Sequence, residues 1–140
     1  MIKTASNAVL LQPDAITAHD RGGGARTTPL VGQAVGATAF ITGYTEFAGG
    51  AEIPFHQHNT EESVVLLEGA AIFDIDGQEI PVRRHDVTFI PPHVPHRFRN
   101  ASPSEPMKIL WIYGSMGATR TLVATGETRP IAAEAAGHGH

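Results

Sequence analysis

The feature that most restricts the fold is the regular interruption of short alternating segments by turn residues. The 15 glycines and 10 prolines are spread along the 140 residues instead of forming one linker. Between them apolar and polar side chains alternate, most clearly in residues 40–45, 71–75 and 107–113. A period of two is typical of strands, and turns at intervals of roughly 8–12 residues are typical of a β-barrel or sandwich. We therefore expect an all-β fold.

The expected strands cover residues 40–45, 53–58, 63–67, 71–75, 79–82, 86–90, 94–99 and 107–113. Asp76-Gly77 gives the strongest hairpin signal, because both residues tolerate the positive φ of a two-residue turn. Residues 1–35 are weakly patterned, and residues 114–140 lose the alternation apart from one possible helical turn over 131–136. This pattern predicts an N-terminal extension or strand (1–35), a barrel (36–115) and a partly flexible C-terminal tail (116–140).

Composition limits the classes of partner. A chain of 14.9 kDa with 41% hydrophobic residues fits one domain. The net charge of −4 gives no reason to expect nucleic acid or an anionic membrane as a partner. Cysteine is absent, which excludes disulfide and thiolate chemistry. The start, Met1-Ile2-Lys3-Thr4, lacks the apolar segment of a secretory signal, so we expect a cytoplasmic protein.

Four residues have the chemistry and spacing of a metal site. His56 and His58 are two residues apart, so on a strand their rings lie on one face, with backbones about 6.5–7 Å apart. Glu62 follows a bend at Asn59-Thr60, and His96 brings a further imidazole from a distant part of the chain. Three imidazoles and one carboxylate suit Mn, Fe, Ni, Cu or Zn better than Ca or Mg. A six-coordinate ion would keep two positions open, whereas a tetrahedral zinc site would be full and structural.

The spacing around these residues resembles the first motif of the cupin family. Gly50, His56, His58, Glu62 and Gly69 match every fixed position of that motif. The resemblance extends over about residues 38–113. It implies a single double-stranded β-helix barrel, the cupin jelly roll, that binds one divalent transition metal per chain through the two motif histidines, Glu62 and His96. Manganese or iron is the expected ion, and zinc, nickel or copper would also fit the donors.

The second cupin motif is matched at Pro91, His96 and Asn100. His85 and His93 stand where the family usually has glycine, which affects turn geometry but no metal ligand. Small cupins often pair through an added strand that covers a sheet edge, so the resemblance also implies a homodimer.

Other candidate site residues lie around the expected barrel interior. His93, Glu46 and Tyr44 are candidate acids or bases acting on bound substrate. For His93 the favoured alternative is an exposed loop residue, and Glu61 is expected at the rim. Which face of each strand points inward is left open. The candidates for lining or filling the substrate pocket are Phe40, Thr42, Phe98, Trp111 and Tyr113.

Three functions are compatible with such a site, because a fold does not determine a reaction. The first is an oxygenase that uses Fe or Mn on a small phenolic, diketone or acid substrate. The second is a redox-neutral isomerase, lyase or cyclase in which the ion acts as a Lewis acid. The third is a non-catalytic module that binds a small ligand or a metal. We expect an oxygenase, with the other two as alternatives.

Overall fold

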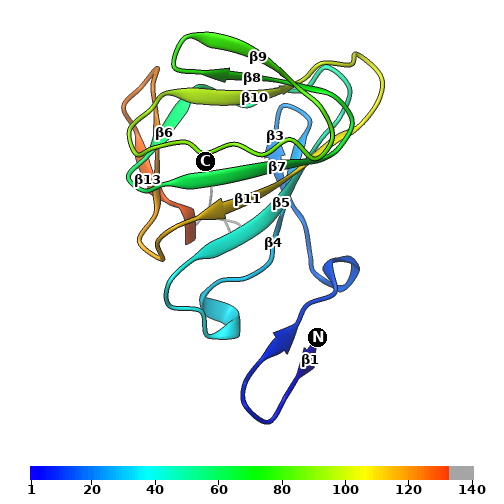
Figure 1. Ribbon diagram of the computed structural model, residues 1–140, viewed down its shortest axis with the longest axis vertical. Helices are drawn as coiled ribbons and strands as arrows, with labels where there is room; N and C mark the ends of the chain where they lie inside the picture. Colours follow the sequence, from blue (N-terminus) through cyan, green and yellow to red (C-terminus); the bar gives the residue numbers. More distant parts are fainter. Residues whose placement is uncertain (133–140) are drawn as a thin grey trace.

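The computed structural model describes residues 1–132 and consists almost entirely of antiparallel strands in two facing sheets (Figure 1). One sheet has the order β3 (His19–Gly22), β4 (Ala25–Pro29), β5 (Ile41–Phe47), β11 (Met107–Tyr113), β7 (Glu62–Glu68). The other has the order β13 (Thr128–Pro130), β12 (Thr119–Leu122), β6 (His56–His58), β10 (His96–Asn100), β8 (Ala71–Ile75), β9 (Gln78–Val82). The chain passes repeatedly from one sheet to the other, which confirms the all-β jelly roll predicted from the sequence.

Short elements complete the described chain. A small hairpin of β1 (Ile2–Lys3) and β2 (Val9–Leu10) extends away from the sheets, as Figure 1 shows. Two 3-10 helices, η1 (Pro13–Ala15) and η2 (Gln33–Val35), lie in the connections that flank β3 and β4. No helix of the described residues is long and apolar enough to cross a membrane.

The core lies between the inner faces of the two sheets. Its largest fully buried apolar side chains come from both sheets: Phe47, Leu66, Phe73, Phe98, Met107 and Ile109. Burying one such side chain contributes roughly 1.5–3 kcal/mol to folding. The alternation along β10 and β11 turns every second residue toward this core, so strand periodicity decides which side chains can reach the interior.

The two sheets are joined on one side and remain open on the other. On the joined side, residues 86–90 bridge to β7 through the pairs Glu62↔Ile90 and Val65↔Val87. The sequence predicted a strand there, but the pairing consists of isolated bridges, and Pro91-Pro92 directly after it has no amide hydrogens to continue a ladder. On the other side β3 and β13 are sheet edges.

Turn chemistry agrees with the sequence at the hairpin between β8 and β9. Asp76 and Gly77 have φ of 51° and 81°, which a two-residue turn of this kind requires. His85 and His93 have φ of 78° and 65°. The positions where cupins usually carry glycine therefore keep the left-handed backbone, although histidine occupies them here.

The C-terminal region contains two strands that the sequence did not indicate. The sequence of β12, TRTL, does not alternate between apolar and polar residues, and all four residues are half-buried. β12 nevertheless pairs with β6, which carries two of the candidate ligands. The helical turn expected over residues 131–136 and the loose end expected after it lie mostly outside the described residues. The division into extension, barrel and tail stays a prediction.

Candidate metal centre

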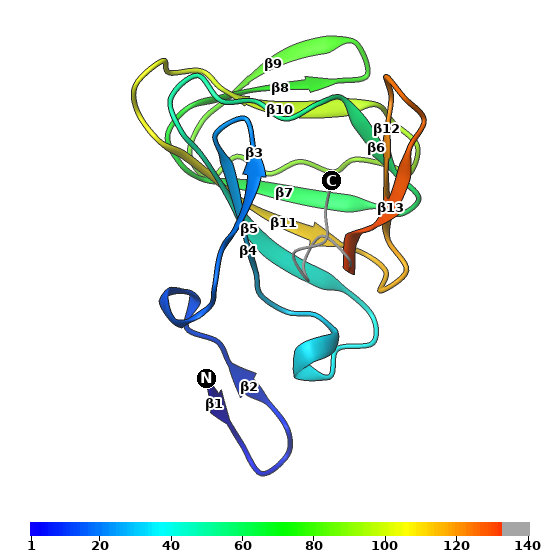
Figure 2. The ribbon, with the colours of Figure 1, turned by 180° about the vertical axis from the view of Figure 1, so that it is seen from behind.

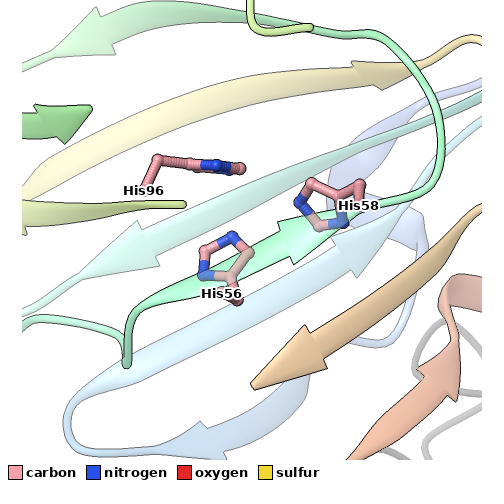
Figure 3. A group of neighbouring side chains, drawn as sticks. All are labelled: His56, His58 and His96. Carbon is pink, nitrogen blue, oxygen red and sulfur yellow. The ribbon is translucent and has the colours of Figure 1, made fainter. Parts of the chain in front are cut away.

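Three histidines converge between the sheets. His56 and His58 point inward from β6, and His96, at the start of β10, is directly opposite His56 in the ladder. The three side chains are buried, and their ligand atoms lie within 4.8 Å of one another (Figure 3). The structure thus brings together the three imidazoles proposed from sequence spacing, in an arrangement that could hold a metal ion.

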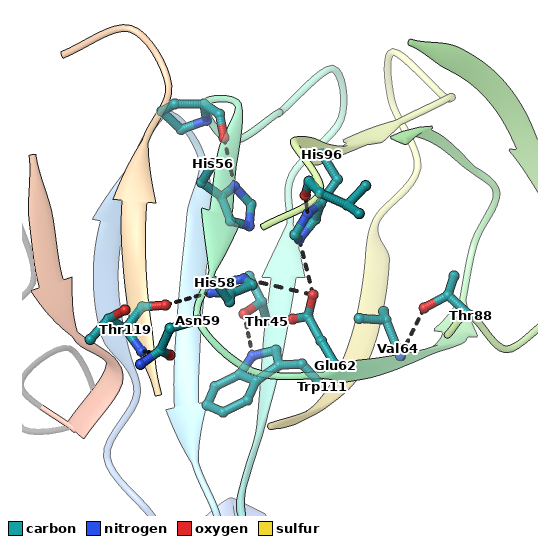
Figure 4. A network of polar contacts seen from close by, with 12 residues as sticks. Thr45, His56, His58, Asn59, Glu62, Val64, Thr88, His96, Trp111 and Thr119 are labelled. Atoms are coloured by element: carbon teal, nitrogen blue, oxygen red, sulfur yellow. Dashed lines mark hydrogen bonds and ion pairs between the residues drawn. The ribbon is translucent and has the colours of Figure 1, made fainter. Parts of the chain in front are cut away.

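Glu62 supplies the carboxylate from the facing sheet. It is the first residue of β7 and is 2% exposed. One of its oxygens, Oε1, is 3.0 Å from Nε2 of His96 and 3.7 Å from Nε2 of His58 (Figure 4). The four predicted ligands therefore lie in one cluster, which we call the inner cluster: His56, His58, Glu62 and His96.

Backbone carbonyls orient all three rings. Nδ1 of His56 is 2.8 Å from the carbonyl of Pro54, and Nδ1 of His96 is 2.8 Å from the carbonyl of Val94. Nδ1 of His58 is 2.9 Å from the carbonyl of Thr119 on β12. A carbonyl can only accept, so each Nδ1 carries the hydrogen. In a neutral ring this leaves Nε2 as a lone pair that faces the other members of the cluster.

This tautomer leaves the inner cluster without hydrogens between its acceptors. Nε2 of His58, Nε2 of His96 and Oε1 of Glu62 are buried and have no hydrogen-bond partner among the described residues. Two acceptors 3.0 Å apart repel each other unless a cation lies between them. One proton can serve one such pair, whereas one divalent ion could serve the three imidazoles, with the Glu62 carboxylate next to two of them. The donor set therefore fits a transition metal.

Electrostatics favours the deprotonated forms that a metal needs. Burial lowers the pKa of His56 well below its ordinary value, and the positive charge of Arg120 lowers this pKa further. Burial also lowers the pKa of His58 to about 4, although the Glu62 carboxylate opposes the shift. Burial alone would raise the pKa of Glu62, but a hydrogen bond from His96 and the positive charge that His58 and His96 carry when protonated outweigh it and lower that pKa.

A chain of polar contacts lines the interior beside the inner cluster. Nε1 of Trp111 donates to Oγ1 of Thr45 over 2.9 Å, and Thr45 and Thr27 share a hydrogen bond of 3.1 Å. Arg21 donates from Nη1 to Thr27 over 3.2 Å. These residues, His56 and Glu62 border a cavity of about 20 Å³, which has room for about one small molecule such as water.

Gly43 leaves room for the Trp111 side chain in this wall. It lies opposite Trp111 in the β5–β11 ladder, and a Cβ atom at this position would be 2.2 Å from the indole ring. The missing side chain leaves room for the indole beside Gly43, with its Nε1 at Thr45.

The structure places three of the five predicted pocket residues at this cavity. Phe98, Trp111 and Tyr113 line it, and the Tyr113 ring centre is 4.6 Å from that of His58. Phe40 is 44% exposed and precedes β5, while Thr42 points to the outer face of β5. The structure does not bring these last two side chains to the inner cluster.

The predicted acids and bases lie elsewhere. Tyr44 and Glu46 share the outer face of β5 with Thr42, and the Tyr44 ring is under Nζ of Lys108. His93 is exposed in the loop before β10, and its amide donates to the carbonyl of His58 over 2.8 Å. Glu61 is exposed. The backbone of His93, rather than its ring, contacts the strand that carries the inner cluster.

Sequence reasoning missed four polar residues near the centre: Arg21, Thr27, Thr45 and Arg120. Arg120 is opposite His58 in the β12–β6 ladder, so the two side chains leave the sheet on the same face. Thr45 lies on the same face of β5 as Ile41 and Phe47. Its inward direction could have been predicted once that face was known to be buried. Arg21 and Arg120 had no such signal, because β3 and β12 do not alternate between apolar and polar residues.

Comparisons with known proteins agree with this architecture. The chain is 39% identical over 88 residues to the polyketide synthase CurC of Streptomyces cyaneus, a match that covers 61% of this chain and about half, 55%, of CurC. It is 24% identical over 130 residues to the tetracenomycin polyketide synthase protein TcmJ of Streptomyces glaucescens, covering 92% of this chain and 86% of TcmJ.

A solved structure shows the same fold over most of the chain. The polyketide cyclase RemF of Streptomyces resistomycificus superposes with a TM-score of 0.71 at 19% identity, covering 89% of this chain and 85% of RemF. The cupin domain model matches residues 43–113, half of the chain, which include all four members of the inner cluster. The chain belongs to the cupin domain family.

Proposed function

We propose that this protein is a metal-dependent enzyme that catalyses a redox-neutral reaction, such as a cyclisation, on a small carbonyl-rich or phenolic substrate. The observation that carries the proposal is the inner cluster, in which buried acceptor atoms face one another without hydrogens. His56, His58, His96 and Glu62 would hold one divalent transition metal. When bound, such an ion would act as a Lewis acid toward a carbonyl or enolate oxygen.

The names of the relatives favour this substrate class. CurC and TcmJ are named polyketide synthase proteins, and RemF, which is similar in fold, is named a polyketide cyclase. Polyketides are chains and rings rich in carbonyl and phenol oxygens. This supports the redox-neutral alternative over the oxygenase that the sequence led us to expect.

The protein's own groups would position the substrate and keep water out. Tyr113 lies between His58 and the cavity, and its hydroxyl helps to lower the pKa of Glu62. Thr45 and Thr27 present hydroxyl groups to the same cavity. Phe98 and Trp111 form apolar walls, which exclude bulk water from the cavity.

An oxygenase remains the second candidate because of the size of the inner cavity. About 20 Å³ beside His56 and Glu62 would admit a diatomic molecule or a water but no organic ring without side-chain movement. The two candidates differ in one measurable requirement, the consumption of dioxygen.

The test begins with elemental analysis of the full chain purified without added metal. Zinc-loaded and iron-loaded protein is then assayed with aromatic β-diketones and phenolic acids, with and without dioxygen. Turnover of the zinc form under anaerobic conditions is the expected result. Turnover that requires iron and consumes dioxygen would replace the proposal with the oxygenase.

A matched pair of histidine variants tests the metal site itself. We expect His58→Ala to lose stoichiometric metal and activity while its circular dichroism stays that of the folded protein. His85→Ala, which removes an exposed ring outside the inner cluster, should keep the metal. Full metal content in His58→Ala would contradict the assignment of the site.

A further inference from the structure

The open side of the two sheets contains a larger cleft beside the cavity of the inner cluster. Figure 2 shows β3 and the β12–β13 hairpin on the viewer's side, with β7 and β11 visible between them. The cleft between them has a volume of about 430 Å³. Three residues, Arg21, Ile53 and Arg120, line both this cleft and the small cavity beside His56 and Glu62. The cleft and the small cavity therefore share part of their walls.

The cleft is positively charged although the chain is acidic. The chain carries a net charge of −4, yet four of its ten basic side chains line this one cleft: Arg21, Arg97, Arg120 and Arg129. Among the described residues, two acidic side chains, Glu52 and Glu127, line it with them, and Asp74 of β8 pairs with Arg97. Because low-dielectric walls strengthen the field of such a group, the cleft should attract anions from solvent.

Each of the two glutamates pairs with an arginine of the cleft. Glu52 is 3.4 Å from Nη1 of Arg97, and Glu127 is 2.6 Å from Nε of Arg129. Arg21 and Arg120 are the two arginines that also border the inner cavity. They come from different sheets, Arg21 from the edge strand β3 and Arg120 from β12, which lies next to the edge strand β13.

We propose that this cleft binds an organic carboxylate and that Arg21 and Arg120 hold its carboxylate group where the cleft meets the inner cavity. The planar guanidinium group matches a carboxylate with two parallel hydrogen bonds. Ile53, Pro54 and Leu122 supply apolar surface for the carbon skeleton. The inference deepens the proposed function by naming an acid as substrate, and it rests on that function only for the contact between substrate and metal.

The polar wall of the cavity fits an oxygen-rich ligand as well. Trp111 donates to Thr45, Arg21 donates to Thr27, and the bond between the two threonines uses one of their two hydroxyl hydrogens. The other hydroxyl hydrogen has no acceptor among the side-chain contacts of the described residues, so it can serve an oxygen atom of a ligand in the cavity.

Equilibrium binding to the metal-free full chain tests the inference without any turnover. The probes are 2-naphthoate and its neutral analogue 2-naphthamide, titrated calorimetrically at low and high salt. Wild type should bind the carboxylate more tightly than the amide, and the preference should shrink with salt. Arg120→Gln and Arg21→Gln should each weaken 2-naphthoate by about tenfold or more and leave the amide nearly unchanged.

Arg84→Gln is the matched control, because it removes the same charge from an exposed residue outside the cleft. It should bind 2-naphthoate as wild type does. Arg120→Lys keeps the charge without the planar fork, and it should bind with intermediate affinity if the fork matters. This variant also serves if Arg120→Gln does not fold.

The outcomes separate this inference from the proposed function. Equal affinity for the carboxylate and the amide, or equal weakening in Arg84→Gln and Arg120→Gln, overturns the carboxylate site. Anaerobic turnover by zinc-loaded Arg21→Gln and Arg120→Gln at the wild-type rate and KM also overturns it while supporting the proposed function. Carboxylate binding that depends on these arginines, in a chain that turns over no substrate, supports the site and counts against the proposed function.

Discussion

Strand β10 carries two clusters of charged or titratable groups on its two faces, and they are satisfied in opposite ways. On the inner face, His96 joins the inner cluster, where lone pairs face a carboxylate. On the outer face, Arg97 and Arg99 flank Asp74 of the neighbouring strand β8. We call this group the outer cluster: Asp74, Arg97 and Arg99.

The outer cluster is complete within the protein. Nε of Arg97 and Nε of Arg99 donate to the same Asp74 oxygen over 2.9 and 2.8 Å, and Nη2 of Arg99 donates to the other over 3.2 Å. Hydrogen bonds from Arg99 lower the pKa of Asp74 in spite of the opposing effect of its burial, and those from Arg97 lower it further. Each acceptor here has a donor.

The inner cluster contains acceptors in excess. Its three rings donate their Nδ1 hydrogens to backbone carbonyls. Ion pairs within the protein thus satisfy the acceptors of the outer cluster, whereas the inner cluster has an arrangement of lone pairs that could hold a cation. The predictions below test that contrast.

Metal binding should have the largest effect. At a free metal concentration about 1,000 times Kd, zinc or manganese should raise the free energy of unfolding by about 4 kcal/mol, because the ion binds the folded chain only. Thermal unfolding with and without the ion measures this gain, and a chelator should reverse it.

Two variants test whether the inner cluster causes this increase in the free energy of unfolding. Glu62→Gln should lose most of the metal-dependent gain, yet it should be no less stable than wild type without metal near pH 8, since its amide can donate to the lone pair of His96. Asp74→Asn should keep the full gain. An unfolding temperature that does not respond to any divalent transition metal would remove the contrast between the clusters.

Acid should affect the metal-free inner cluster next most strongly. The pKa of His58 is about 4 in the folded protein, while its ordinary value is 6.5. Between these values the unfolded chain binds more protons, so stability is complete above about pH 6.5 and falls as the pH approaches 4. The loss should be on the order of 3 kcal/mol for this residue.

Denaturant unfolding of metal-free protein across this pH range measures the loss. His58→Gln should flatten the curve, because glutamine does not titrate. A stability that stays constant between pH 6.5 and 4.5 would show that His58 is not held neutral by its surroundings.

The outer cluster should contribute less. Asp74→Asn leaves Arg97 and Arg99 without their shared carboxylate, but both arginines are partly exposed, so solvent and salt screen the interaction. We expect an unfolding temperature a few degrees lower at low salt and a smaller decrease at high salt. A loss that does not depend on salt would indicate a packing defect instead of a lost ion pair.

The sequence predicted that the residues of the inner cluster converge, because much of the information is local. That they bind a metal stays a prediction. His56 and His58 must share a face of any strand, and Glu62 and His96 lie at the spacing of a known motif. The Asp76-Gly77 hairpin was also predictable, since its two positive φ values are properties of those residues.

The walls of the cavity were less predictable because they depend on partners distant in sequence. β5 carries large side chains on both faces, so its pattern alone does not show that Ile41 and Thr45, rather than Phe40 and Tyr44, point inward. The need for glycine at position 43 can be explained only once Trp111 is known to lie opposite it. The position of Arg120 beside His58 depends on the pairing of β12 with β6. The sequence of β12 does not alternate between apolar and polar residues, so it does not predict this pairing.

The smallest expected effect separates the backbone of a loop from its side chain. His93 has φ of 65°, a conformation that costs a non-glycine residue about 1 kcal/mol, and its amide donates to the carbonyl of His58. In His93→Gly the relief of strain and the greater freedom of the unfolded chain oppose each other, so stability should change by less than about 1 kcal/mol. Metal affinity, measured by competition with a chromophoric chelator, should equal that of wild type, since the variant keeps the amide. A weakened affinity in His93→Gly would assign the ring a part in the inner cluster and would extend that cluster beyond β6, β7 and β10.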